Sequence, residues 1–277
     1  MFTAVAIMLL VEDGLLRLDD CIRDYFPKSP LQWQAIKIRH LLNHTSGLGE
    51  DCTDVKNEFT DEEYLAQCYE GTVAFEPGSR WMYSNIGYSL LGIIITNVSC
   101  KHWSIFLEER VFLPAEMKTA CMIDDFKILK HRASGYEMID DEIKNQQWVS
   151  AFANTLGSGS LYLSLLDWMK WDLAVAKRKL LSEHSWRQIF SKTRLNCGQE
   201  YPYGFGWEIE ESEAHGLAYG HLGSWQGFTS GLLRYDQLGL TFVAMANLGE
   251  TDIQFILDGI VERYDTSLRI KRIEASL

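Results

Sequence analysis

The segment from Phe2 to Val11 (FTAVAIMLLV) constrains the fold more than any other part of this 277-residue chain. At helical spacing it is apolar on nearly every face, and such a helix is stable only when it is buried all round. The fold is therefore expected to be built around it. Glu12 and Asp13 follow, and Gly14 is expected to form the C-terminal cap. Nothing in the printed sequence precedes this helix to cover it or to bond its first amide groups.

Composition excludes several classes of function. The net charge of −12 and the sequence pI near 5.1 argue against a nucleic-acid partner, because binding to phosphates requires a basic face. Residues 1–11 lack a basic leader and a cleavage site, and they are too short to cross a bilayer, so neither a signal peptide nor a membrane span is predicted. Apolar residues make up 47% of the chain, which is typical of a globular protein of one large or two modest domains.

The chain has six cysteines, and no two of them form a Cys-x-x-Cys pair. This spacing argues against a zinc site, and we predict no metal or organic cofactor. Buried reduced thiols are the preferred interpretation, which favours a reducing compartment such as the cytoplasm. The six are Cys21, Cys52, Cys68, Cys100, Cys121 and Cys197.

Helical patterns dominate the first 200 residues. Capping boxes at Thr60/Glu63 and Ser164/Asp167 predict helices over 61–69 and 165–177, and residues 103–111 continue another helix. Residues 124–147 are polar and aperiodic, which predicts a long surface loop.

The pattern changes near Tyr201 to short alternating segments separated by turn residues. These predict an antiparallel meander, followed by an amphipathic helix over 252–264. The expected strands are 204–209, 218–223, 227–235 and 240–246. The sequence thus predicts an α+β fold with a mostly helical domain over 1–200 and a sheet domain over 201–277.

Tyr83 and Asn85 carry the first candidate chemistry. A Pro77-Gly78 turn precedes them and an apolar run of helical length, Ile86 to Val98, follows, so they fall at a loop-to-helix junction. A phenol, with a pKa of about 10, becomes a base near neutrality only beside a cation, and a carboxamide is both donor and acceptor. The structural alternative is that Tyr83 is half-buried core and that Asn85 caps the following helix.

His44 and Ser46 lie two residues apart in Asn43-His44-Thr45-Ser46-Gly47 and could suggest a base and a nucleophile. On a turn, side chains at this separation do not naturally meet, and Ser or Thr before Gly is typical of a helix end. A structural role is therefore favoured for this pair.

A second chemical signal is His221-Leu222-Gly223-Ser224, at the end of one predicted strand. Gly223 lets a ligand or another backbone approach closely, and a strand that ends in an open amide can donate to an oxyanion. The alternative for His221 is a turn histidine whose ring nitrogens are satisfied locally.

Together these motifs resemble the penicillin-binding-protein-like serine hydrolases, which include class C β-lactamases, DD-peptidases and related esterases. The resemblance extends over essentially the whole chain, through five stretches in the expected order. They are FTAVAIMLLVEDGLLRLDD, IRHLLNHTSGL, FEPGSRWMYSNIGYSLLG, YGFGW and GHLGSWQGF. The resemblance implies a β-lactamase/transpeptidase-like fold, and acylation of a serine followed by hydrolysis of an ester, amide or peptide substrate.

The resemblance also implies roles for individual residues. Tyr83 would be the phenolate or proton-shuttling base, and Asn85 would orient the catalytic lysine and the substrate amide. His221 would stand where a Lys stands in the family's Lys-Thr-Gly version, interacting with Tyr83 and substrate. The stretch Gly223, Ser224 and Trp225 would bind substrate, with room beside Gly223 and half of the oxyanion hole from the Ser224 amide.

One departure from the family bears on activity. The family's nucleophile is the Ser of Ser-x-x-Lys, which would lie immediately before Met1, and no serine in the printed chain has Lys three residues later. No Gly-x-Ser-x-Gly elbow replaces it. Without the lysine's charge Tyr83 is expected to stay a neutral phenol, and without the serine no acyl-enzyme forms. The strands that precede the nucleophile in the family are also absent, which leaves a sheet edge that favours self-association.

The sequence therefore predicts a recognisable cleft with little or no hydrolase activity, and three interpretations stay open. The chain is a serine hydrolase with a truncated start, a non-catalytic binder of peptide or acyl ligands, or a piece that a separate chain completes. An in-frame Ser-x-x-Lys encoded upstream of Met1 would select the first, and a soluble monomer that binds ligand without turnover would favour the second. Histidine in place of Lys at position 221 favours an esterase or peptidase over a dedicated β-lactamase.

Overall fold

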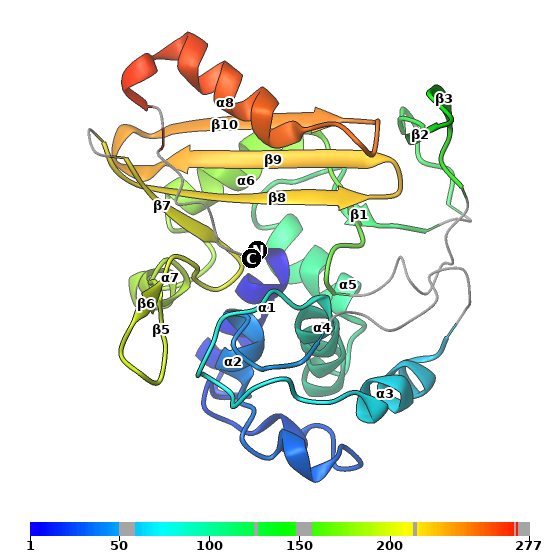
Figure 1. The fold of residues 1–277 in the computed structure, drawn as a ribbon, viewed down its shortest axis with the longest axis vertical. Helices are drawn as coiled ribbons and strands as arrows, with labels where there is room; N and C mark the ends of the chain where they lie inside the picture. The colour runs from blue at the N-terminus through cyan, green and yellow to red at the C-terminus, as the bar shows by residue number, and fades with distance from the viewer. Residues whose placement is uncertain (50–58, 125–126, 148–156, 213–214, 269, 271–277) are drawn as a thin grey trace. The chain divides into compact units, whose positions relative to one another are not determined.

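A computed structural model describes residues 1–49, 59–124, 127–147, 157–212, 215–268 and 270 (Figure 1). The chain divides into two compact units. Unit 1 comprises Met1–Phe126 and Val149–Gly206, and unit 2 comprises Lys127–Trp148 and Trp207–Leu277. This division differs from the predicted boundary at residue 200 chiefly because the segment 127–148 joins the sheet-containing unit.

Among its described residues, unit 1 is mainly helical and carries two short strand pairs, β1 with β4 and β5 with β6. Its helices are α1 (Phe2–Glu12), α2 (Ile38–Leu42), α3 (Asp61–Glu70), α4 (Asn85–Ser99), α5 (Trp103–Leu107), α6 (Leu165–Ala176) and α7 (Glu183–Ile189), with 3-10 turns η1 (Ile22–Asp24) and η2 (Leu31–Trp33). The strands are β1 (Cys121–Met122), β4 (Leu161–Tyr162), β5 (Thr193–Arg194) and β6 (Glu200–Tyr201).

Helix α1 is the buried centre of unit 1, as its composition predicts. Every residue from Phe2 to Leu10 is buried, and the ring of Phe2 packs on that of Trp171 with centroids 4.6 Å apart. Gly14, just beyond the helix, has φ +71°, the left-handed conformation in which glycine ends a helix without strain.

Both predicted capping boxes are confirmed. The Oγ1 of Thr60 accepts from the amide of Glu63 while the Glu63 carboxylate accepts from the amide of Thr60, at the start of α3. Ser164 and Asp167 make the same reciprocal pair at the start of α6. Each pair bonds amide groups that the first helical turn would otherwise leave without acceptors.

The predicted helix over 103–111 is not uniform. It is α-helical in α5 and then widens into a π-helix, η3 (Glu108–Phe112). An apolar periodicity does not distinguish these two hydrogen-bond patterns, so the sequence could not predict the change. Across the part of the chain that the structure describes, no single helix is both long and apolar enough for a membrane span. Among those residues, only α4 taken together with the helix from Trp103 to Phe112 reaches that length and hydropathy, and these two are bent by 79° relative to each other.

The predicted meander is confirmed in unit 2, except that its first strand, expected over 204–209, runs from Glu208 to Ser212. Its four-stranded antiparallel sheet has the order β10-β9-β8-β7. The strands are β7 (Glu208–Ser212), β8 (Gly216–Trp225), β9 (Phe228–Tyr235) and β10 (Leu240–Ala246). Strands β8 and β9 meet at Gln226-Gly227, both with positive φ, which is the geometry of a tight two-residue hairpin turn.

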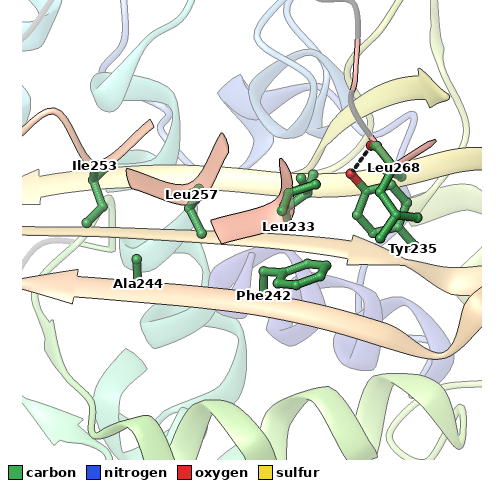
Figure 2. Close-up of a cluster of buried hydrophobic side chains, with 9 residues drawn as sticks. Leu233, Tyr235, Phe242, Ala244, Ile253, Leu257 and Leu268 are labelled. Atoms are coloured by element: carbon green, nitrogen blue, oxygen red, sulfur yellow. Dashed lines mark hydrogen bonds between the residues drawn. The ribbon is translucent and has the colours of Figure 1, made fainter. Parts of the chain in front are cut away.

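Helix α8 (Ile253–Tyr264) packs on β9 and β10 and forms the core of unit 2 (Figure 2). Ile253, Leu257 and Val261 recur at every fourth position and are buried, so they present one apolar face to the sheet. Beside them, the hydroxyl of Tyr235 donates to the carbonyl of Leu268 at 2.6 Å. The predicted amphipathic helix is confirmed.

The prediction of a long loop over 124–147 was wrong. Residues in this segment form a hairpin of β2 (Tyr136–Ile139) and β3 (Glu142–Asn145). Its turn residues, Asp140 and Asp141, both have positive φ, as a two-residue hairpin requires. Aspartate tolerates this conformation, so the Asp-Asp pair between two short strands was the sequence signal that loop polarity concealed.

The prediction of buried thiols holds at one position and fails at two. Cys68 is buried, whereas Cys100 and Cys197 are exposed. Cys52 lies outside the described residues.

Candidate functional site

The Tyr83–Asn85 segment sits at the start of α4, and Ser84 rather than Asn85 is its N-cap residue. The Oγ of Ser84 accepts from the amide of Gly87 at 3.3 Å and donates to the carbonyl of Gly49 at 3.0 Å. Because Ser84 does the capping, Asn85 does not have the capping role that the sequence offered as its structural alternative. Asn85 is exposed, and Tyr83 is 41% exposed, so Tyr83 is half-buried as its structural alternative described.

His44 fixes the backbone of the Tyr83–Asn85 segment. Its Nδ1 accepts from the amide of Ser84 at 3.1 Å, and its carbonyl accepts from the amide of Met82 at 2.9 Å. The other ring nitrogen, Nε2, lies 3.1 Å from the hydroxyl of Tyr203. Through its ring and its carbonyl, His44 is thus hydrogen-bonded to the backbone on either side of Tyr83, and a third bond joins the ring to Tyr203.

The turn upstream of Tyr83 is fixed by the hairpin of β5 and β6. Asn196, between these strands, donates from its side chain to the carbonyl of Pro77 at 3.0 Å and from its amide to the carbonyl of Gly78 at 2.8 Å. A few residues on, the ring of Trp81 stacks on that of Tyr201 with centroids 4.4 Å apart and planes 13° from parallel. The whole stretch from the turn to α4 is therefore anchored at several points.

Ser46 has the structural role that the sequence favours. It is buried, and its Oγ accepts from the amide of Leu48 at 3.2 Å. This is a local turn contact, not the environment of an activated nucleophile.

His44, the histidine that packs on Tyr83, is not a cation. A nitrogen that accepts an N–H bond carries no proton, so the His44 ring is neutral, with its proton on Nε2 facing Tyr203. The neutral His44 ring therefore adds no positive charge that would favour a Tyr83 phenolate. Nearby, burial raises the pKa of Tyr88 well above its ordinary value, and its hydroxyl donates to the carbonyl of Leu42.

The second group of predicted site residues lies together in unit 2, on β8. His221, Gly223, Ser224 and Trp225 are consecutive or nearly so at the C-terminal end of this strand. Burial lowers the pKa of His221 to about 4, so its ring is neutral near pH 7. The ring Nδ1 donates to the carbonyl of Leu222, which makes Nε2 the acceptor nitrogen.

Strand β8 is longer than its neighbour β7. The last β7 pair is Glu208 with Gly220, whereas pairing with β9 continues to Trp225. Among the described strands, the stretch 221–225 is thus paired on one side only. Ser224 and Gly223 are also exposed, and a Cβ at Gly223 would meet Ser230 Oγ at 3.0 Å. This stretch has the form of a strand end that can accept an extended ligand.

Tyr83, Asn85 and the His221 stretch stay predictions from the sequence, which missed the residues that hold the backbone around the first two. His44 was recognised only as part of a turn, and Asn196 and Tyr203 were not singled out. The sequence did offer one signal for His44. It is a large residue immediately before a helix-end pattern, where a smaller residue would serve.

The mixed helical and antiparallel architecture, with a Tyr-x-Asn segment at a helix start and a His-x-Gly segment on a sheet strand, defines a β-lactamase/transpeptidase-like fold. The chain belongs to the Beta-lactamase family, whose model matches residues 1–259. The predicted resemblance and fold class are thereby confirmed.

Individual proteins of known sequence or structure agree with this membership. Penicillin-binding protein 4* of Bacillus subtilis is 31% identical over 270 residues, covering 90% of this chain and 59% of that protein. The D-amino acid amidase from Ochrobactrum anthropi SV3, complexed with L-phenylalanine amide, is 26% identical with a TM-score of 0.79, covering 96% and 80% of the two chains. The octameric penicillin-binding protein homologue from Pyrococcus abyssi is similar in fold, with 23% identity, a TM-score of 0.78 and coverage of 95% and 63%. The chain spans 59% of the length of the Bacillus subtilis relative.

Proposed function

We propose that this chain carries the ligand-recognition part of an acyl-serine hydrolase site for small amides, esters or peptides. Tyr83 serves as the proton-carrying phenol and Asn85 as the group that orients a substrate amide. His221 presents an acceptor nitrogen, and the stretch Gly223, Ser224 and Trp225 binds the ligand backbone. Membership of the Beta-lactamase family and similarity to a D-amino acid amidase support the amide and peptide substrate class.

The observation that carries the proposal is the contrast at Tyr83-Ser84-Asn85. The backbone is fixed by His44 and by the cap of Ser84, while the two chemically useful side chains are exposed. Exposed polar groups on a rigid frame are what a binding site needs, because little order is lost when a ligand binds.

We further propose that the 277-residue chain binds such ligands but does not turn them over by itself. No serine in it has the Lys that would activate a nucleophile, and the neutral His44 does not provide a substitute charge for Tyr83. The alternative function is that of a binder of peptide or acyl ligands that has no catalytic role at all. It rests on the same two observations, the lack of a Ser-x-x-Lys and the neutral His44.

The test uses the purified chain with D-phenylalanine amide, a chromogenic ester and a chromogenic β-lactam. We expect measurable binding of the amide by calorimetry, no product release above the uncatalysed rate, and no mass increase of the intact protein. Asn85→Ala should weaken binding about tenfold, the effect of losing a well-placed hydrogen bond and leaving its partner unsatisfied. Asn97→Ala, at the other end of α4, is the matched control. An acyl adduct on Ser46 or any other serine would contradict the absence of turnover.

We also propose that unit 2 self-associates through its sheet edge. Strand β10 is the last strand in the order of the described sheet, and its Met245 is 41% exposed. A strand edge with apolar side chains is a template for pairing with another copy.

A further inference from the structure

We infer that His44 is a positioning residue that sets both the backbone and the ring orientation of the Tyr83–Asn85 segment. The proposed function gives His44 no chemical step. It is only 1% exposed, and it cannot contact a ligand in the way the exposed Tyr83 can. The inference takes its importance for ligand binding from the proposed function, but the link between His44 and Tyr83 is a structural one.

The backbone of His44 is in an unusual conformation. Its φ is +59°, in the left-handed region that glycine adopts most easily. A residue with a Cβ in this region is strained, and it persists where the surroundings hold it. A glycine would avoid that strain, so the side chain itself has to stabilise the fold here.

The stabilising contacts of His44 converge on the segment that bears Tyr83. The ring accepts from the Ser84 amide at 3.1 Å, and the carbonyl accepts from the Met82 amide at 2.9 Å. These two bonds bracket Tyr83 in the sequence. They fix the main chain immediately before and immediately after the phenol, so its Cα has little freedom.

The imidazole also packs against the Tyr83 ring. The two centroids are 4.3 Å apart with planes 32° from parallel, so the rings are in direct contact. The ring of Tyr88 lies 5.1 Å from the imidazole at 29°. One face of the phenol is thereby supported while the side chain as a whole stays partly exposed.

Imidazole meets these demands in a way that other side chains cannot. It accepts at Nδ1 from Ser84 and donates at Nε2 to Tyr203, and it is flat enough to stack. Asparagine can imitate only the Nδ1 position, and phenylalanine only the flat ring. The two substitutions therefore separate the hydrogen-bonding role from the stacking role.

The experiment compares His44→Asn and His44→Phe by NMR, with amide exchange at Ser84 and the ring-carbon signal of Tyr83 as the two readouts. The Tyr83 signal is assigned from the spectrum of Tyr83→Phe. In His44→Asn we expect a protected Ser84 amide and a shifted Tyr83 signal. In His44→Phe we expect Ser84 exchange to rise about tenfold, as for the loss of one hydrogen bond, with a Tyr83 signal close to that of the original protein.

The matched control is His40→Phe in the neighbouring helix α2. The Nδ1 of His40 also accepts a backbone amide, that of Lys37 at 3.2 Å, but it does so away from Tyr83. This variant should lower overall stability without moving either readout. If His44 contributed only to the stability of the unit as a whole, its variants would change amide exchange throughout α4 equally, and that outcome would overturn the inference.

Ligand binding separates this inference from the proposed function. Failure of the original protein to bind D-phenylalanine amide would overturn the proposed function and leave both NMR readouts valid. Unchanged Ser84 exchange and an unchanged Tyr83 signal in both His44 variants would overturn the inference, whatever the ligand does. If neither variant folds, the original protein decides: a Ser84 amide that exchanges as fast as an exposed one contradicts the inference, and slow exchange supports it.

Discussion

Four hydrogen-bond donors surround the carboxylate of Asp167, a buried acid in the first turn of α6. They are the amide and hydroxyl of Thr119 and the amide and hydroxyl of Ser164. Burial alone would raise the pKa of Asp167, but these bonds outweigh it and hold the pKa below its ordinary value of 3.8. A carboxyl with a lower pKa in the folded state adds stability above the unfolded pKa and loses it as pH falls through the folded pKa.

We expect Asp167→Asn to lower the free energy of unfolding by about 2 kcal/mol at pH 7, because an amide NH₂ would face groups that donate. The difference from the original protein should shrink as pH falls below about 4. Urea unfolding between pH 7 and pH 3 measures it. Glu63→Gln changes the equivalent capping acid on the exposed start of α3 and should have a smaller effect. A difference that does not depend on pH would refute this account of Asp167.

At the same scale, the sequence located residues whose role depends on local pattern and missed those defined by distant contacts. The Pro-Gly turn and the apolar run that frame Tyr83 and Asn85 are adjacent to them in the chain. His44 is 40 residues from Ser84 and 159 from Tyr203, so no local pattern shows which groups its ring bonds.

Helix α8 illustrates how one element binds to the sheet through a single face. Leu257 is 1% exposed within the cluster of Figure 2, whereas Phe255, two residues earlier, is 75% exposed. The two side chains are both large and apolar, and they differ mainly in what they contact.

Leu257→Ala is expected to reduce the free energy of unfolding by about 2–5 kcal/mol, since it removes buried methyl groups and leaves a cavity. Phe255→Ala should change it much less, because the larger side chain is mostly in water in the folded protein. Thermal or urea unfolding followed by circular dichroism provides the comparison. Equal losses from the two variants would show that α8 does not dock through the Leu257 face.

Elements were predictable wherever their ends carry chemical signals. The capping boxes of α3 and α6 predicted two helix starts correctly. Alternation with Gly turns placed the last three strands of the meander, whereas the first was predicted about four residues too early. The β2–β3 hairpin was missed because its strands are short and half-exposed, so their burial pattern scarcely differs from that of a polar loop. The hairpin is stabilised by contacts with the rest of unit 2. The Tyr136 amide donates to the carbonyl of Asn247, and the Tyr136 carbonyl accepts from the amide of Gly249.

At the scale of the whole molecule, the fold class and family followed from the order of several motifs rather than from any one of them. Each motif alone had a plausible structural explanation, and the turn histidine at position 44 shows that such explanations are sometimes correct. That Tyr83, Asn85 and His221 act on one ligand remains a prediction. A double-mutant cycle between Asn85 and His221 on ligand binding would measure their coupling.

The proposed association through β10 predicts a concentration-dependent mass. Sedimentation should show the chain shifting from monomer to larger species as its concentration rises. Met245→Lys, which puts a charge on the edge strand, should raise the dissociation constant at least tenfold. Met138→Lys, at a similarly exposed methionine in the β2–β3 hairpin, is the control and should leave it unchanged. A single monomeric species at all concentrations would exclude the association.

The unequal lengths of β7 and β8 have a consequence for how specificity could change. Beyond Gly220, an extended peptide bound alongside β8 would be recognised through hydrogen bonds to its backbone, and the backbone is the same in every sequence. Preference for one peptide over another must then be decided by side chains, such as that of Trp225 on the same strand. Substitutions of such side chains would change which peptide is preferred and would leave the hydrogen-bonding edge of β8 unchanged.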